Sequence, residues 1–357
     1  MSLLRQTLMN VFSDHLVEFA VHPKGDDSMG NWISTISYES HHDFACQNLL
    51  AGSGQWLFDS DEFISWDSTD PLTSTVLWLH GIPGSGKTSL VALAIQRERK
   101  RLADTKAQLA FFYCQRSSAE PQRSKQRELL RSLLRQLAFD KNGGLKGPVR
   151  TLYAKKNKEA ELAQHEVQVF TDEEVITLLV ELFKMRNTTI IIDALDEMIR
   201  DERPTLYEVF DDISERLRDD NSTDNRHAVL RLLVSSRNDR DIVLKLSSYR
   251  NVGIGVANNR EDIREFVKRE LKKSIRGYQL LVDTPKDQQQ EILELIERTL
   301  VTKAQGMYVS SSWTPTVVRG TKLTLLGSDG SASRYRGSVK HETQSPYINS
   351  WLRYPRI

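Results

Sequence analysis

The fold of this 357-residue chain is indicated most clearly by one short stretch, Gly81-Ile82-Pro83-Gly84-Ser85-Gly86-Lys87-Thr88. Its glycines allow backbone N–H groups to wrap around the oxygens of a phosphate group. The apolar run Val76-Leu77-Trp78-Leu79 precedes it and is typical of a buried strand, while residues 89–101 have the pattern of a helix. A strand, this loop and a helix in that order define a P-loop, and the positive end of the helix points at the same phosphate.

Two side chains at the end of the stretch supply the chemistry. Lys87 is expected to reach the β- and γ-phosphates of a nucleotide, and the Thr88 hydroxyl is expected to bind Mg²⁺. The rest of the nucleotide cradle is predicted to be Gly81, Ile82, Pro83, Gly84, Ser85 and Gly86. A glycine-rich turn without a ligand is the alternative, and the flanking strand and helix disfavour it.

A second apolar run, Thr189-Ile190-Ile191-Ile192, leads into the acidic segment Asp193-Ala194-Leu195-Asp196-Glu197. Ligands bind at the carboxyl edge of parallel sheets, so Asp193 is expected to hold Mg²⁺ there, directly or through water. Asp196 or Glu197 can orient an attacking water, and Asp196 is slightly favoured because it is closer to Asp193. Alone, such a segment is also typical of a helix N-terminus, but the upstream P-loop favours the Mg²⁺ interpretation.

A third apolar run, Leu232-Leu233-Val234, ends in Ser235-Ser236-Arg237. If its strand joins the same sheet, Arg237 lies at the ligand-binding edge and can contact the γ-phosphate and respond to its loss. An ordinary surface arginine is the alternative, and the position at a strand tip favours the functional role.

The fold class follows from the alternation of these runs with helical patterns. Strands are expected at residues 75–80, 109–114, 188–193, 228–235 and 251–256. Helices are expected at 89–101, 124–138, 171–185, 206–217, 260–271 and 288–304, with Thr171 and Asn259 as caps, and as short segments within 38–66. This alternation predicts an α/β protein whose parallel sheet is sandwiched between helices.

Three segments are expected along the chain. Residues 1–37 form an N-terminal extension with an amphipathic helix near 3–20 and a loop at 22–37, and residues 38–307 form the nucleotide-binding domain. Residues 308–357 are rich in serine, threonine and glycine, with seven Lys/Arg and two Asp/Glu, which predicts an irregular, disordered tail. His41-His42-Asp43 is a weak metal candidate, and a solvated loop is favoured there.

Composition excludes several classes of protein. The net charge is +1, so no global field favours nucleic acid or an anionic membrane. No apolar run approaches the roughly 20 residues of a membrane-spanning helix. The two cysteines, Cys46 and Cys114, lie in unrelated contexts, which favours a reducing compartment and a cytoplasmic protein, with Cys114 as a small core residue.

The three motifs together resemble the NACHT class of STAND ATPases, because a small residue, Ala194, follows the aspartate and displaces the acidic pair to Asp196-Glu197. The wider sequence is similar to the nephrocystin-3-like N-terminal NTPase domain common in fungal NOD-like receptors. The similarity rests on Gly54-Gln55-Trp56-Leu57, Phe63-Ile64-Ser65-Trp66, Leu77-Trp78-Leu79-His80 with the P-loop, Ser235-Ser236-Arg237 and Asn258-Asn259-Arg260-Glu261-Asp262-Ile263.

This resemblance covers roughly residues 38–307 and implies a switch that is closed with ADP and oligomeric with ATP, coupled to effector partners. It also implies a helical subdomain and a winged helix after Met307, where this chain continues into residues 308–357 instead, so we expect a truncated member. The expected cofactors are ATP and Mg²⁺, with GTP as the alternative base. The leading function is slow ATP hydrolysis; the alternatives are a nucleotide-binding regulator without turnover and, less favoured, a small-molecule kinase.

Overall fold

The computed structural model describes residues 24–308, apart from 48, 69–75, 104, 106, 141, 219–228, 279–285 and 305. The predicted helix near residues 3–20 and all but the first residue of the predicted tail at 308–357 lie outside these residues. The chain divides into two compact units after Asp262, and each is described separately.

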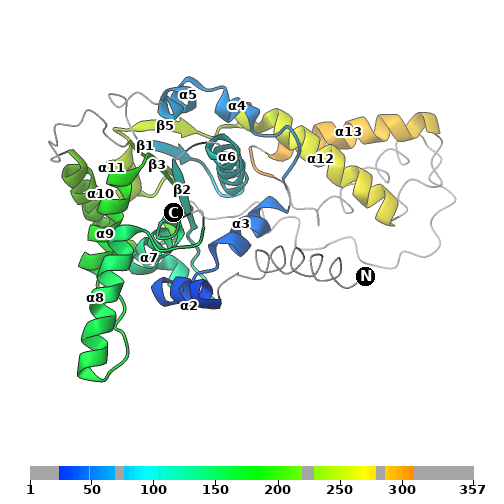
Figure 1. Cartoon of the computed structure of the whole chain (residues 1–357). Coiled ribbons are helices and arrows are strands. Elements are labelled where there is room, and N and C mark those ends of the chain that lie inside the picture. Colours follow the sequence, from blue (N-terminus) through cyan, green and yellow to red (C-terminus); the bar gives the residue numbers. More distant parts are fainter. Residues whose placement is uncertain are drawn as a thin grey trace, which may run out of the picture. The chain divides into compact units, whose positions relative to one another are not determined.

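The first unit is built on a five-stranded sheet (Figure 1). The strands are β1 (Val76–His80), β2 (Gln108–Tyr113), β3 (Thr188–Asp193), β4 (Leu230–Ser236) and β5 (Arg250–Gly253). Their order is β2-β3-β4-β1-β5 and every neighbouring pair is parallel, which confirms the predicted parallel sheet. The strand that is fourth in sequence therefore lies between the strand that leads into the P-loop and the strand that ends at Asp193.

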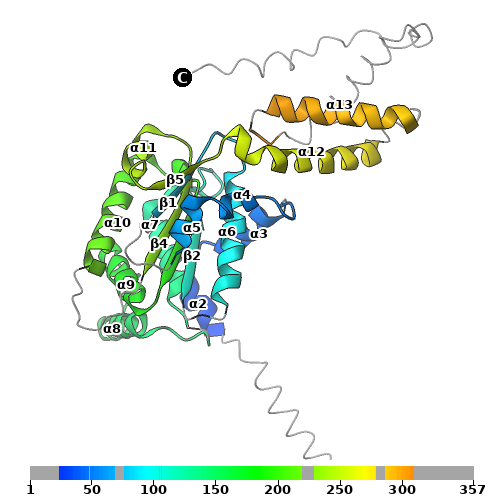
Figure 2. The same cartoon turned by 90° about the horizontal axis from the view of Figure 1, so that it is seen from above.

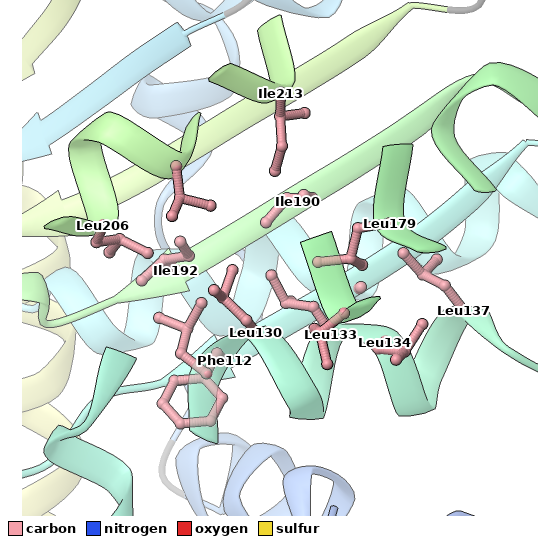
Figure 3. Close-up of a cluster of buried hydrophobic side chains, with 14 of the residues drawn as sticks. Phe112, Leu130, Leu133, Leu134, Leu137, Leu179, Ile190, Ile192, Leu206 and Ile213 are labelled. Carbon is pink, nitrogen blue, oxygen red and sulfur yellow. The ribbon is translucent and has the colours of Figure 1, made fainter. Parts of the chain in front are cut away.

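One face of the sheet is covered by helices whose apolar sides meet the even-numbered residues of β2, β3 and β4. The helices of this face include α7 (Gln126–Leu137), α9 (Asp172–Met185), α10 (Arg203–Arg218) and α11 (Arg240–Leu246). Figure 3 shows Leu130, Leu133, Leu134 and Leu137 of α7 gathered against the sheet strands. Full burial of one leucine contributes about 1.5–3 kcal/mol, so this leucine face is a main anchor of α7.

The opposite face carries the helices that flank the P-loop. They are α3 (Tyr38–Cys46), α4 (Gln55–Phe58), α5 (Asp61–Asp67) and α6 (Lys87–Leu102). Phe63 and Trp66, both fully buried, pack in the same cluster as Leu77 and Leu79 of β1. The predicted sandwich, with helices on both faces of the sheet, is confirmed.

The predicted loop at residues 22–37 is wrong, because α2 spans Lys24–Ile33. Its glycines and aspartates are poor helix formers, but tertiary packing overrides such weak preferences. Ile33 is buried in the core, and the Trp32 ring lies edge-on to Phe170 and Tyr153 at centroid distances of 4.8 and 5.2 Å.

The predicted solvated loop at His41-His42-Asp43 is also wrong, because these residues lie within α3. His42 is buried and its Nδ1 lies 2.9 Å from the Tyr113 hydroxyl, so it is a core histidine. Among the described residues, no cluster of three or more His, Cys, Asp or Glu side chains could hold a metal ion. Cys114 is buried in the core as predicted, and both cysteines are free thiols.

Three further helices, α8, α12 and α13, are labelled in Figure 2. Helix α8 (Gly147–Ala163) lies between α7 and α9 in sequence, and α12 (Val256–Tyr278) runs from the first unit into the second, which also contains α13 (Lys286–Ala304). Apolar side chains of α12 and α13 form a separate small core, and α13 is followed by Gly306 in the left-handed conformation, as its sequence predicted. No helix of the described ranges meets the length and apolarity needed to span a membrane.

Candidate functional site: a P-loop at the carboxyl edge of the sheet

The glycine-rich stretch connects β1 to α6, as the sequence predicted. Gly84 and Gly86 have φ angles of +73° and +91°, in the left-handed region that costs residues with a Cβ atom. Ile82, Pro83 and Gly84 are exposed, whereas Gly81 and Ser85 are buried, so the loop presents only its outer rim to solvent. The 16-residue helix α6 begins at the end of this loop without a side-chain cap on its first N–H groups, which is typical of helix ends that bind anions.

Lys87 is the first residue of α6, and its side chain folds back over the loop. Its Nζ atom donates hydrogen bonds to the backbone oxygens of Gly81 and Ile82, at 2.7 and 2.9 Å. Burial lowers the pKa of this ammonium group, against the opposing effect of the Asp196 and Asp193 charges. The charged amine is therefore held directly above the backbone that would surround a phosphate.

Asp193 lies at the carboxyl end of β3 and is almost completely buried. Its carboxylate accepts a hydrogen bond from the Ser235 hydroxyl of β4. Burial raises the pKa of Asp193, while the nearby Ser235 and Thr88 hydroxyls and the Lys87 charge act against that rise. The structure therefore places the two predicted metal ligands, Thr88 and Asp193, near one another at the carboxyl edge of the sheet.

This pair of oxygen donors fits Mg²⁺, which prefers carboxylate and hydroxyl oxygens and is usually bound by one or two protein groups together with substrate phosphates. The proximity of the Thr88 hydroxyl to the Asp193 carboxylate, which Ser235 holds from the neighbouring strand, is the observation that supports the fit.

Asp196, Glu197 and Arg237 come together beside this pair, although they belong to two different loops. The carboxylate of Asp196 accepts a hydrogen bond from the backbone N–H of Arg237 at 2.9 Å and forms an ion pair with its Nε at 3.0 Å. Glu197 lies 3.9 Å from Nη2 of the same arginine and accepts a hydrogen bond from the Arg116 amide. Asp196 is nearly buried at 6% side-chain exposure, whereas Glu197 is 33% exposed.

The sequence indicated the site residues but missed several of their partners. The sequence motif at the end of the third apolar run contains Ser235 but predicts no role for it. In the structure its hydroxyl donates to Asp193 and accepts from the backbone amide of Ala194. Asn259 was predicted to cap a helix; it lies inside α12 instead, and its side-chain amide donates to the Ser85 backbone oxygen at 3.2 Å. No sequence pattern marked Arg203, which is buried against the Asp196 loop.

A parallel sheet flanked by helices, with a glycine-rich loop between β1 and α6 and a buried aspartate at the end of β3, defines a P-loop NTPase fold. The family model described as Nephrocystin 3, N-terminal, matches residues 52–237, a little over half of the chain. The chain belongs to this family, and the resemblance found in its sequence is confirmed.

A curated relative is the vegetative incompatibility protein HET-E-1 of Podospora anserina. It is 28% identical over 207 residues, which are 56% of this chain and 13% of that protein. The chain therefore spans about an eighth of the length of this relative.

Solved structures similar to the chain include the ORC2 protein of Aeropyrum pernix in ADPNP–ADP complexes, at 13% identity and a TM-score of 0.34, covering 75% of this chain and 64% of that one. PCH-2 of C. elegans matches at 15% identity and a TM-score of 0.35, covering 80% of this chain and 72% of that one. Both TM-scores are below 0.5, so the fold assignment rests on the strand order and the P-loop.

Proposed function

We propose that the chain is a nucleotide switch module that binds ATP with Mg²⁺ and hydrolyses it slowly. The observation that carries this proposal is the convergence at one sheet edge of the Lys87 amine, the Thr88–Asp193 pair and the Asp196–Arg237 ion pair. A loop that only bound phosphate would need the first of these and not the other two. Lys87, the loop backbone and the start of α6 bind the β- and γ-phosphates.

Thr88 and Asp193 hold Mg²⁺ in this proposal, and the ion supplies positive charge that offsets the charge of the phosphates when it is bound. Ser235 fixes the Asp193 carboxylate from the neighbouring strand. This hydrogen bond keeps the oxygen ligands in place because both partners are buried side chains on adjacent strands.

The geometry favours Glu197 over Asp196 for orienting the attacking water. The Asp196 carboxylate is already bound to the amide and the guanidinium of Arg237, so its role is to position that arginine. Glu197 is more exposed: one of its carboxylate oxygens accepts from the Arg116 amide, and the other lies 3.9 Å from Nη2 of Arg237, beyond hydrogen-bond distance. Arg237 is half exposed, so its guanidinium can turn toward a γ-phosphate and stabilise the charge that develops there.

The family and the fungal relative support a signalling role in a protein of the NOD-like receptor type. The module is closed with ADP, assembles with further copies when ATP is bound, and acts on an effector partner. Two free thiols support a cytoplasmic location.

A single-turnover assay with radiolabelled ATP and excess protein tests this proposal. We expect ATP to bind in the presence of Mg²⁺ and to be converted to ADP slowly, at a rate that Arg237→Ala lowers. Binding without conversion would instead identify a regulator that reads nucleotide occupancy alone. Transfer of the phosphate to an added small molecule would identify a kinase, and the absence of binding would exclude all three functions.

A further inference from the structure

Arg203 is a buried charge outside the predicted site. It is the first residue of α10, and only 2% of its side chain is exposed. Its Nη1 atom donates to Asp239 at 2.9 Å and to Asp241 at 3.0 Å, and its Nη2 atom donates to the backbone oxygen of Asp196. One guanidinium group therefore contacts two carboxylates and one peptide oxygen.

These contacts join the two loops that carry the proposed hydrolysis residues. Asp196 belongs to the loop after β3, and Asp239 and Asp241 lie at the start of α11, two and four residues after Arg237. Asp196 is consequently bound from two sides, because its backbone oxygen accepts from Arg203 and its carboxylate accepts from Arg237. Movement of either loop would break a contact to Arg203.

Stability alone is a poor explanation for this arrangement. A positive charge at the start of a helix is opposed by the helix dipole, and a buried ion pair is often no more stabilising than apolar residues of similar volume. Among the described residues, the Nε atom of Arg203 has no hydrogen-bond partner, so its donors are not fully satisfied. A planar guanidinium does, however, fix several acceptors in defined directions, which an ammonium group cannot do.

We propose that Arg203 is a positioning residue of the hydrolysis site, which holds the Asp196 loop and the Arg237 loop together so that Arg237 is directed at the γ-phosphate. This inference rests on the proposed ATP hydrolysis. It requires that loss of the guanidinium geometry slows hydrolysis and leaves nucleotide binding intact, because within the described part of the chain the hydrogen bonds of Arg203 go to Asp196, Asp239 and Asp241 and not to the P-loop stretch or Asp193.

The test compares Arg203→Lys with Arg216→Lys in the full chain. Arg216 lies on the same helix, where it forms an ion pair with Asp212, and serves as the matched control. We expect Arg203→Lys to bind a fluorescent ATP analogue within about two-fold of the native affinity while its single-turnover rate falls about ten- to hundred-fold, the range expected when a reacting group is misplaced. Arg216→Lys should keep the native affinity and the native single-turnover rate.

A double variant distinguishes positioning from general destabilisation. If Arg203 acts through Arg237, then Arg203→Lys should lower the rate no further in an Arg237→Ala background. Multiplying effects, a native rate in Arg203→Lys, or a parallel loss of nucleotide affinity would each overturn the inference. If Arg203→Lys does not fold, Asp241→Asn removes one of its carboxylate partners and is expected to give the same rate loss; a native rate in that variant would equally overturn it.

Hydrogen exchange gives a readout that does not depend on turnover. The Arg237 amide is bound by Asp196, so Arg203→Lys should accelerate exchange in peptides that span residues 194–197 and 236–240, with no change in α6 or β1. Unchanged exchange there, or acceleration throughout the unit, would contradict positioning. If the native protein does not hydrolyse ATP, the proposed function fails, and this exchange pattern alone then decides whether Arg203 holds the two loops together.

Discussion

Among single residues, the sequence predicted which side chains gather at the carboxyl edge of the sheet but not which of them contact one another. The P-loop and Asp193 were predictable because each follows an apolar strand, and strand ends meet at one edge of a parallel sheet. The pairing of Asp196 with Arg237 was not predictable, because the two residues are 41 positions apart and meet only through the strand order. That pairing is what leaves Glu197 as the better candidate for orienting water.

A comparison of Glu197→Gln with Asp196→Asn tests this division. Glu197→Gln should slow single-turnover hydrolysis by about 10²–10⁴-fold with little change in ATP affinity, because it removes the carboxylate that orients water. Asp196→Asn should have the smaller effect on the rate. It should also weaken the protection of the Arg237 amide from hydrogen exchange, because that amide donates to the Asp196 carboxylate. Native rates in both variants would show that the acidic pair is structural.

Among the helices, the capping signal at Thr171 predicted a helix start correctly, whereas the one at Asn259 did not, because α12 already begins at Val256. Thr171 forms the predicted capping box, in which its hydroxyl accepts from the Glu174 amide at 3.2 Å and Glu174 accepts from the Thr171 amide at 2.7 Å. Helix α2 shows the opposite case, because its residues lack a helical signal and the helix depends on packing of Trp32 and Ile33. Tertiary contacts of this kind cannot be read from a local window.

Removal of the cap has a defined cost. Thr171→Ala should lower the free energy of unfolding by about 1 kcal/mol, because it leaves the Glu174 amide of the first turn unsatisfied. Thr151→Ala, at an exposed position within α8, is the control and should change the value by less than about 0.5 kcal/mol. Urea unfolding measures both, and equal effects of the two variants would show that the capping box contributes nothing.

At the scale of the whole molecule, the class of the fold followed from alternating strands and helices, but the strand order did not. Placement of β4 between β1 and β3 brings Ser235 to Asp193 and Ser236 to the Trp78 indole at 2.8 Å. Nothing in the spacing of the strands dictates that order, because it depends on which helices cover which face.

The pH dependence of folding gives a prediction at the same scale. Lys146 donates to the Leu137 backbone oxygen and to Gln108, and burial, together with the nearby Arg186 charge, lowers its pKa from 10.5 to about 8. Between these two values the unfolded chain binds more protons than the native state, so stability from this group rises with pH.

The free energy of unfolding of the native protein, relative to Lys146→Met, should therefore be constant below about pH 8 and should rise between about pH 8 and pH 10.5. Chemical unfolding of both proteins across this range measures the difference. A difference that stays flat, or that falls as the pH rises, would contradict the lowered pKa.

Residues 81–88 are proposed to bind the phosphates of ATP, and equilibrium titration of Lys87→Ala with a fluorescent ATP analogue measures whether they do. Loss of a charge-assisted contact of about 1.5–3 kcal/mol predicts an affinity about ten- to hundred-fold weaker than that of the native protein. Lys100→Ala, at an exposed position near the end of the same helix, should bind like the native protein. An unchanged affinity in Lys87→Ala would contradict the account.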